Sequence, residues 1–167
     1  MLKIIGIDPG YAIVGWGVIN YDSMRFVTMS YGAITTPSNI DFLSRISMIY
    51  EQLDDILNTY KPDEMAIEKL FFASNKKTGI DVAQARGVIL LSAKCHGLSV
   101  SEYTPIQVKQ GVVGYGRAEK RQVMNMTKRL LNLNKMPKLD DTADALAIAI
   151  AHAHSYSSRL LKLKETK

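Results

Sequence analysis

Residues 3–10 read KIIGIDPG, a short apolar run that ends in an acid, a proline and a glycine. A continuous apolar run stopped by a Pro-Gly pair is typical of a strand that is buried on both faces and followed by a turn. Residues 12–20 and 25–35 are predicted to form two further strands, separated by a short polar turn. Because short connections favour antiparallel neighbours, the chain is expected to begin with a three-stranded meander.

Beyond residue 40 the apolar residues recur at helical spacing, and strands and helices then alternate. This order predicts an α/β fold in which a mixed sheet is flanked by helices. No repeat or Pro/Gly-rich linker divides the sequence, so residues 1–167 are expected to form a single domain. Helices are expected at about 40–60, 79–96, 105–111, 118–132 and 140–158, and strands at 64–68 and 99–103.

The composition is that of an ordinary globular protein, with 47% hydrophobic and 22% charged residues. The net charge of +5 is a weak indication of a polyanionic partner. A single cysteine, Cys95, excludes an internal disulfide, fits a reducing cytosol and is expected in the core. The first apolar run ends too early for a signal peptide, and no apolar run approaches the roughly 20 residues of a membrane span. A soluble cytoplasmic protein is therefore expected.

Two acids end predicted strands, Asp8 the first strand and Glu68 the fourth. A helical crossover can return the fourth strand parallel to the first, so both carboxylates would emerge at one edge of the sheet. Ligands bind at this edge in open α/β sheets. For either acid alone, a turn or helix-capping role is the commoner explanation.

The last predicted helix begins with three aspartates, in the stretch KLDDTADALAIAIAHAH at 138–154. Asp140 fits an N-cap, because aspartate is a preferred capping residue. Asp144 lies a full turn inside, among alanines and a leucine, where an ionised carboxylate is costly unless it is paired or binds a cation. Asp141 and Asp144 are three residues apart and can share one helix face.

Asp8, Glu68, Asp141 and Asp144 would repel one another if they met, and each would raise the pKa of the others. Oxygen ligands of this kind suit Mg²⁺ or Mn²⁺, and two such ions about 4 Å apart promote phosphodiester hydrolysis. His152 lies roughly 12 Å further along the helix than Asp144. His152 and His154 are therefore interpreted as structural or surface residues.

Five motifs occur in the order typical of one family: GIDPG at 6–10, AIE at 66–68, QARGV at 84–88, VKQGVVGYGRAEK at 108–120 and DDTADALAIAIAHAH at 140–154. The sequence resembles the RuvC family of Holliday-junction resolvases, which belong to the ribonuclease-H-like superfamily. The resemblance implies a five-stranded mixed sheet, in which three antiparallel strands are joined by two parallel ones. It also implies that four acids hold two Mg²⁺ ions, for which Mn²⁺ can substitute: Asp8, Glu68, Asp141 and Asp144.

The resemblance further implies a homodimer that resolves four-way DNA junctions by paired symmetric nicks, in homologous recombination and DNA repair. The family acts with the branch-migration complex of RuvA and RuvB. Lys109 and Lys120 match basic residues near the scissile phosphate and are expected to assist catalysis, although each could also be an ordinary lysine on a solvated helix face. DNA contacts are expected from Phe71, Lys76, Lys77, Lys109, Arg117 and Lys120.

Several alternatives stay open at this point. Phe71 and Phe72 follow Glu68 closely and could stack on unpaired bases or anchor the segment in the core; the resemblance favours a junction-facing Phe71. GIDPG also resembles the phosphate turn of sugar-kinase-like and actin-like ATPases, although these need a second, related domain. A non-catalytic junction-binding protein of the same fold is the other alternative. Residues 79–96 are the preferred dimer helix, because their apolar side chains cover more than one face.

Overall fold

A computed structural model describes the backbone of residues 1–23, 25–70 and 76–165, and the side chains of these residues except 76–78 and 159–165. The centre of the fold is one five-stranded sheet with the strand order β3-β2-β1-β4-β5. Its strands are β1 (Leu2–Asp8), β2 (Ile13–Tyr21), β3 (Phe26–Thr35), β4 (Glu64–Glu68) and β5 (Ser99–Tyr103).

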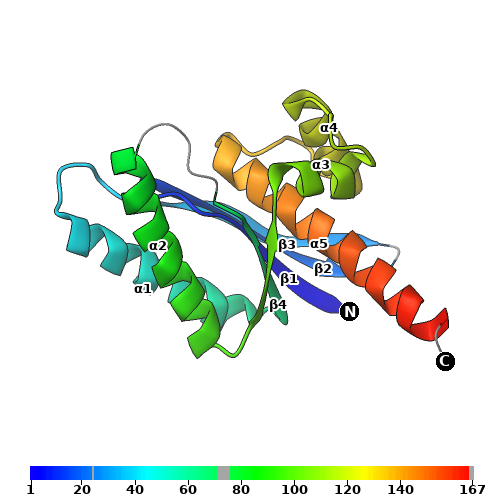
Figure 1. The fold of residues 1–167 in the computed structure, drawn as a ribbon, viewed down its shortest axis with the longest axis horizontal. Helices are drawn as coiled ribbons and strands as arrows, with labels where there is room; N and C mark the ends of the chain where they lie inside the picture. Colours follow the sequence, from blue (N-terminus) through cyan, green and yellow to red (C-terminus); the bar gives the residue numbers. More distant parts are fainter. Residues whose placement is uncertain (24, 71–75, 166–167) are drawn as a thin grey trace.

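Helices cover both faces of this sheet. Figure 1 shows α1 and α2 on one side, with α3, α4 and α5 on the other. The predicted mixed α/β fold is confirmed. The helices are α1 (Phe42–Tyr60), α2 (Lys76–Cys95), α3 (Pro105–Val113), α4 (Lys120–Leu130) and α5 (Asp140–Glu165). Within the described ranges, no helix combines the length and the apolar character needed to cross a membrane.

The strand register brings the ends of β1 and β4 to the same edge. β1 pairs antiparallel with β2, and Asp8 lies opposite Gly15. β1 pairs parallel with β4, and Ile7 lies opposite Ile67. Because the next residue on each of these two strands is an acid, Asp8 and Glu68 emerge side by side, as the sequence predicted.

α5 is the helix that packs most closely on the sheet. Its alanines and isoleucines are buried against β1 and β2, and Leu146 is fully buried. Glycines on the strands permit this approach: a Cβ atom at Gly6 would overlap the carbonyl oxygen of Ala145, and one at Gly15 would overlap that of Asp141. Any larger residue at these positions would push the helix away from the sheet.

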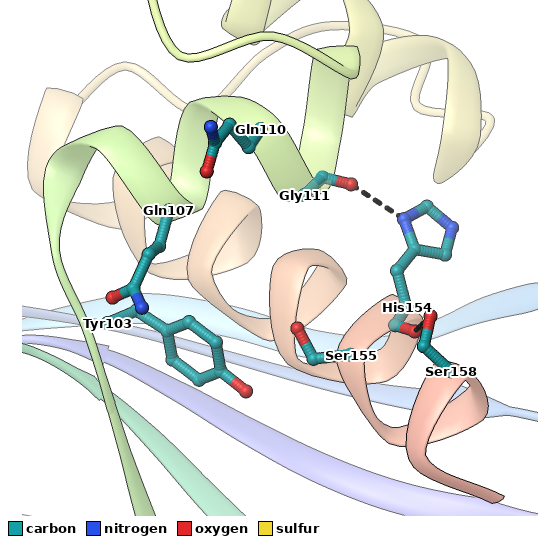
Figure 2. Close-up of a pocket in the computed structure, with 7 residues that line it drawn as sticks. All are labelled: Tyr103, Gln107, Gln110, Gly111, His154, Ser155 and Ser158. Carbon is teal, nitrogen blue, oxygen red and sulfur yellow. Dashed lines mark hydrogen bonds between the residues drawn. The ribbon is translucent and has the colours of Figure 1, made fainter. Parts of the chain in front are cut away.

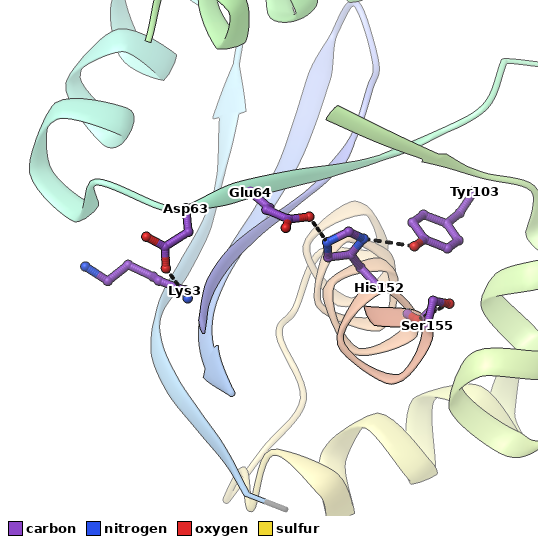
Figure 3. Close-up of polar contacts among 7 residues, drawn as sticks. Lys3, Asp63, Glu64, Tyr103, His152 and Ser155 are labelled. Atoms are coloured by element: carbon purple, nitrogen blue, oxygen red, sulfur yellow. Dashed lines mark hydrogen bonds and ion pairs between the residues drawn. The ribbon is translucent and has the colours of Figure 1, made fainter. Parts of the chain in front are cut away.

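A buried histidine ties α5 to the two parallel strands (Figure 3). The His152 side chain is fully buried, and Nε2 lies 2.7 Å from Oε2 of Glu64, at the beginning of β4. Its Nδ1 lies 2.8 Å from the hydroxyl of Tyr103, at the end of β5. The structural interpretation of His152 is therefore confirmed. The network stabilises α5 against β4, the strand that ends at Glu68.

Candidate active site

Two adjoining pockets gather the acids at the sheet edge. The first has a volume of about 190 Å³ and is lined by Asp8 and Glu68. The second has a volume of about 280 Å³ and is lined by Glu68, Asp144, Lys109 and Lys120. Glu68 lines both pockets, so the strand-end acids and the helix acid belong to one continuous site.

The close packing of α5 decides where its acids lie. The backbone carbonyl of Asp141 sits directly over Gly15, and Gly15 is the residue paired with Asp8 in the sheet. The first turn of α5 therefore lies over the end of β1. Asp144, one turn further along, keeps 33% of its side chain exposed, so it is neither a core residue nor a freely solvated one. Its backbone neighbours Ala143 and Ala145 are fully buried and hold it in place.

The acids of the site have perturbed pKa values. Burial, together with the negative charges of Glu68, Asp144 and Asp141, raises the pKa of Asp8 from 3.8 to about 7. Burial and the charge of Asp144 also raise the pKa of Glu68. For Asp144, burial raises the pKa even though Lys120 acts in the opposite direction. Negative charge at this edge is therefore not fully compensated by the protein.

Lys120 is the cation that contacts these acids directly. Its Nζ lies 3.1 Å from Oδ2 of Asp144 and 3.1 Å from Oδ2 of Asp140. Partial burial lowers the pKa of Lys120, but the hydrogen bonds to Asp140 and Asp144 outweigh this effect and raise it. The lysine is held as a cation beside the helix acids.

The N-cap interpretation of Asp140 was wrong. α5 begins at Asp140, and the amide of Ala143 donates a hydrogen bond to the carbonyl of Leu139. Leu139, the residue before Asp140, therefore occupies the N-cap position. The carboxylate of Asp140 is 69% exposed and accepts a hydrogen bond from Lys120. Its role is electrostatic, because it helps to hold Lys120 next to Asp144.

The donor set fits a hard divalent cation. Carboxylate oxygens are the ligands that Mg²⁺ and Mn²⁺ prefer, and no described residue lining the two pockets is a cysteine or a histidine. In the described part of the chain, no three such side chains converge closely enough to form a ready coordination shell. The fit rests on the chemistry of the acids and on their uncompensated charge.

The other predicted site residues are distributed unevenly. Lys109 lines the larger pocket and is half-buried on α3. Arg117 is exposed in the turn before α4, and it is not among the described residues that line the two pockets. Phe71 and Phe72 lie outside the described residues. The backbones of Lys76 and Lys77 begin α2, but their side chains are also outside the description.

A set of side-chain contacts on the other side of the sheet was not predicted from the sequence. Arg45 is buried on α1, and its guanidinium carbon lies 3.7 Å from the centre of the Tyr11 ring. Its Nε donates to the hydroxyl of Thr36, which in turn donates to the carbonyl of Tyr11. These contacts fix the turn directly after Asp8. No local signal could reveal them, since the partners are 25 and 34 residues from Tyr11 in sequence.

Comparisons with known proteins agree with this geometry. Residues 4–152 match the family described as crossover junction endodeoxyribonuclease RuvC. A RuvC of Alkaliphilus oremlandii is 58% identical over 145 residues, covering 87% of this chain and 88% of its own. One from Fusobacterium nucleatum is 49% identical over 159 residues, covering 95% of this chain and 84% of its own.

A solved structure also superimposes closely. The RuvC of Thermus thermophilus, in complex with a Holliday junction substrate, matches with a TM-score of 0.89 and 30% identity, covering 93% of this chain and 95% of that protein. A second structure of Thermus thermophilus RuvC gives a TM-score of 0.86. Sequence family, fold and the edge of acids therefore agree, and the chain belongs to the RuvC family of crossover junction endodeoxyribonucleases.

Proposed function

We propose that this chain resolves four-way DNA junctions by paired symmetric nicks, with Asp8, Glu68, Asp141 and Asp144 holding two Mg²⁺ ions. Membership of a family of metal-dependent junction nucleases supports the reaction class. The observation that carries the metal assignment is the raised pKa of Asp8, Glu68 and Asp144. Acids whose ionisation is opposed by burial and by neighbouring negative charges are stabilised by a bound divalent cation.

The larger pocket is the proposed position of the scissile phosphate. When bound, the metal ions would lower the pKa of a water molecule and stabilise the charge that develops on the leaving oxygen. Lys109 and Lys120 line the same pocket and add positive charge around the phosphate. Attack of water on phosphorus and departure of the 3′ oxygen leave 5′-phosphate and 3′-hydroxyl ends. Asp140 maintains the position of Lys120 during this step.

The remaining expectations belong to the same proposal. Residues 1–167 act as one nuclease domain in the cytoplasm, within homologous recombination and DNA repair, together with RuvA and RuvB. Mn²⁺ substitutes for Mg²⁺, because both are hard divalent ions that accept carboxylate ligands. Further DNA contacts come from Phe71, Lys76, Lys77 and Arg117. Support for the DNA substrate comes from the Thermus thermophilus structure with a Holliday junction substrate.

A homodimer through α2 would supply the two active sites that paired nicks require. An exposed stripe follows one face of α2 at helical spacing, and it contains Ile80, which is 55% exposed, and Leu91, which is 59% exposed. Gly87 lies between them, and a Cβ atom there would meet nothing within 4 Å. Cys95 ends the stripe and is exposed, so its expected place in the core was wrong. An open apolar stripe with a glycine at its centre suits close contact with a second copy.

The first prediction separates binding from cutting. Asp144→Asn should still bind a synthetic four-way junction but should cut it at least about 100-fold more slowly in Mg²⁺, because one metal ligand loses its charge. Asp55→Asn is the matched control, since it removes an exposed carboxylate on α1, on the other side of the sheet, and it should keep the cutting activity of wild type. Gel analysis of end-labelled strands measures both.

A linear duplex of the same sequence tests the substrate class. The wild-type protein should make paired nicks in the junction and leave the duplex intact. Equal cutting of both substrates would indicate a general nuclease, and binding without cutting would indicate the non-catalytic alternative. Full cleavage by Asp144→Asn would contradict the metal assignment.

The second prediction concerns pH. The folded metal-free protein holds the proton of Asp8 up to about pH 7, whereas the unfolded chain releases it near pH 4. Ionisation therefore destabilises the fold as the pH rises from about 4 to about 7. Asp8→Asn stays neutral and should be more stable than wild type at pH 8, by on the order of 2–4 kcal/mol.

Urea unfolding in EDTA at pH 4.5 and pH 8 measures this difference. The advantage of Asp8→Asn should be small at the lower pH and large at the higher one. Asp55→Asn on the exposed face of α1 is the control and should show no such pH dependence. An advantage of Asp8→Asn that is equal at both pH values would refute the electrostatic origin of the effect.

The third prediction tests the dimer. Leu91→Glu places a charge in the exposed stripe of α2 and should weaken self-association by about 100-fold, because burying an unpaired charge costs several kcal/mol. Ile106→Glu is the control: Ile106 is 60% exposed on α3, on the opposite side of the sheet, and should leave the dimer intact. Sedimentation velocity measures both. A wild-type protein that stays monomeric at micromolar concentration, or an unchanged Leu91→Glu dimer, would overturn the assignment.

A further inference from the structure

α4 carries its charge on one exposed face. Val123 and Thr127 face the core, and no residue from Lys120 to Leu130 is acidic. Polar and basic side chains on the opposite face recur at helical spacing, so they form one solvent-facing stripe. The stripe consists of Arg121, Gln122, Asn125, Lys128 and Arg129.

The stripe connects the active site to a second, distant hollow. α4 begins at Lys120, which contacts Asp144. Its last turn contains Arg129, which lines a hollow of about 420 Å³ together with Arg25 and His154. His154 is ten residues beyond Asp144 on α5, which corresponds to roughly 15 Å of helix. The hollow therefore lies outside the catalytic pockets, at the far end of α4.

The hollow combines cations with an aromatic floor. The Phe26 ring stacks on Tyr21 with centroids 4.8 Å apart, and the His154 ring meets Phe26 edge-on at 5.3 Å. A hydrogen bond of 2.7 Å between His154 Nδ1 and the carbonyl of Gly111 fixes the imidazole. Arg25 and Arg129 are exposed, and within the described part of the chain neither forms an ion pair. Two unpaired guanidiniums in one hollow are suited to bind phosphate oxygens.

A neighbouring hollow provides a comparison. It has a volume of about 340 Å³ and lies between α3 and α5, where Figure 2 shows the Gly111 carbonyl pointing towards the His154 ring. Its described lining includes Gln107, Gln110 and Ser158 and contains no lysine or arginine. An anionic ligand would therefore select the hollow with the two arginines.

We propose that the exposed face of α4 and the Arg25–Arg129 hollow form a track that binds the phosphate backbone of a DNA arm leaving the cut site. The proposal rests on the proposed function, because it assumes that a junction arm starts at the catalytic pocket. Arg129 lies eight positions after Arg121 on α4, a distance of roughly 12 Å along the helix. One DNA strand advances about 3.4 Å per nucleotide, so the track spans three to four phosphates. The arginine hollow receives the phosphate at its far end.

The test compares two double variants that remove the same charge. Arg25→Gln/Arg129→Gln empties the hollow of cations. Lys61→Gln/Lys94→Gln removes two exposed lysines near the ends of α1 and α2, on the other side of the sheet. Fluorescence anisotropy in EDTA measures binding to a four-way junction at several salt concentrations. The arginine variant should bind about tenfold more weakly, with a salt slope that is shallower by up to about 2, whereas the lysine variant should resemble wild type.

A modified substrate locates the contact. Uncharged methylphosphonate linkages replace the phosphates three to five nucleotides from the cut, on each side in turn. On one side this change should weaken wild-type binding but add no further loss to the arginine variant, because both remove the same interaction. Additive losses on both sides, or an arginine variant with the affinity and salt slope of the lysine variant, would overturn the track.

The same measurements separate this inference from the function it rests on. A wild-type protein that binds a junction no better than a linear duplex would contradict the proposed function and the track together. Tight junction binding by wild type and by the arginine variant alike would overturn the track alone.

Discussion

The close contact between α5 and the glycines of β1 and β2 is the constraint on which the active site depends. Gly15 has no side chain, so the backbone of Asp141 can lie directly over the strand residue that pairs with Asp8. The alanines of α5 provide the other half of this contact, and the buried His152 holds the helix to β4. A side chain at Gly15 would push the first turn of α5, which carries Asp141, away from the end of β1. The packing of the α5 backbone on the strands thus determines how far the helix acids lie from the strand-end acids.

The same contact places carboxylates of like charge near one another, so they repel when ionised. Burial at this edge, together with the charges of Glu68, Asp144 and Asp141, raises the pKa of Asp8 to about 7. Lys120 relieves part of this repulsion and is itself held by Asp140. The protein therefore keeps the acids in place at a cost in stability. α4 continues from Lys120 to Leu130 without an acidic residue, so it extends the positive potential that begins at Lys120.

Sequence periodicity was sufficient to predict the sheet and to single out three acids at its edge. Asp8 and Glu68 end apolar runs, and Asp144 is a carboxylate that no capping role explains, so each carries a local signal. Asp140 was misassigned because helix propensity locates a helix start only to within a residue or two. The partner of Asp140 is 20 residues away, and Cys95 faces solvent on a helix whose sequence is apolar on several sides. Such features depend on tertiary contacts, which periodicity does not encode.

Manganese affinity in two glycine variants tests the central constraint most directly. Gly15→Ala places a methyl group against the backbone of Asp141, whereas Gly17→Ala places one 2.5 Å from Cδ2 of Leu146, a side chain that can move. Calorimetric titration with Mn²⁺ should show affinity at least about tenfold weaker in Gly15→Ala, because its helix acids are displaced, and close to wild type in Gly17→Ala. Circular dichroism confirms that both variants are folded. A folded Gly15→Ala protein that binds Mn²⁺ as tightly as wild type would contradict the account.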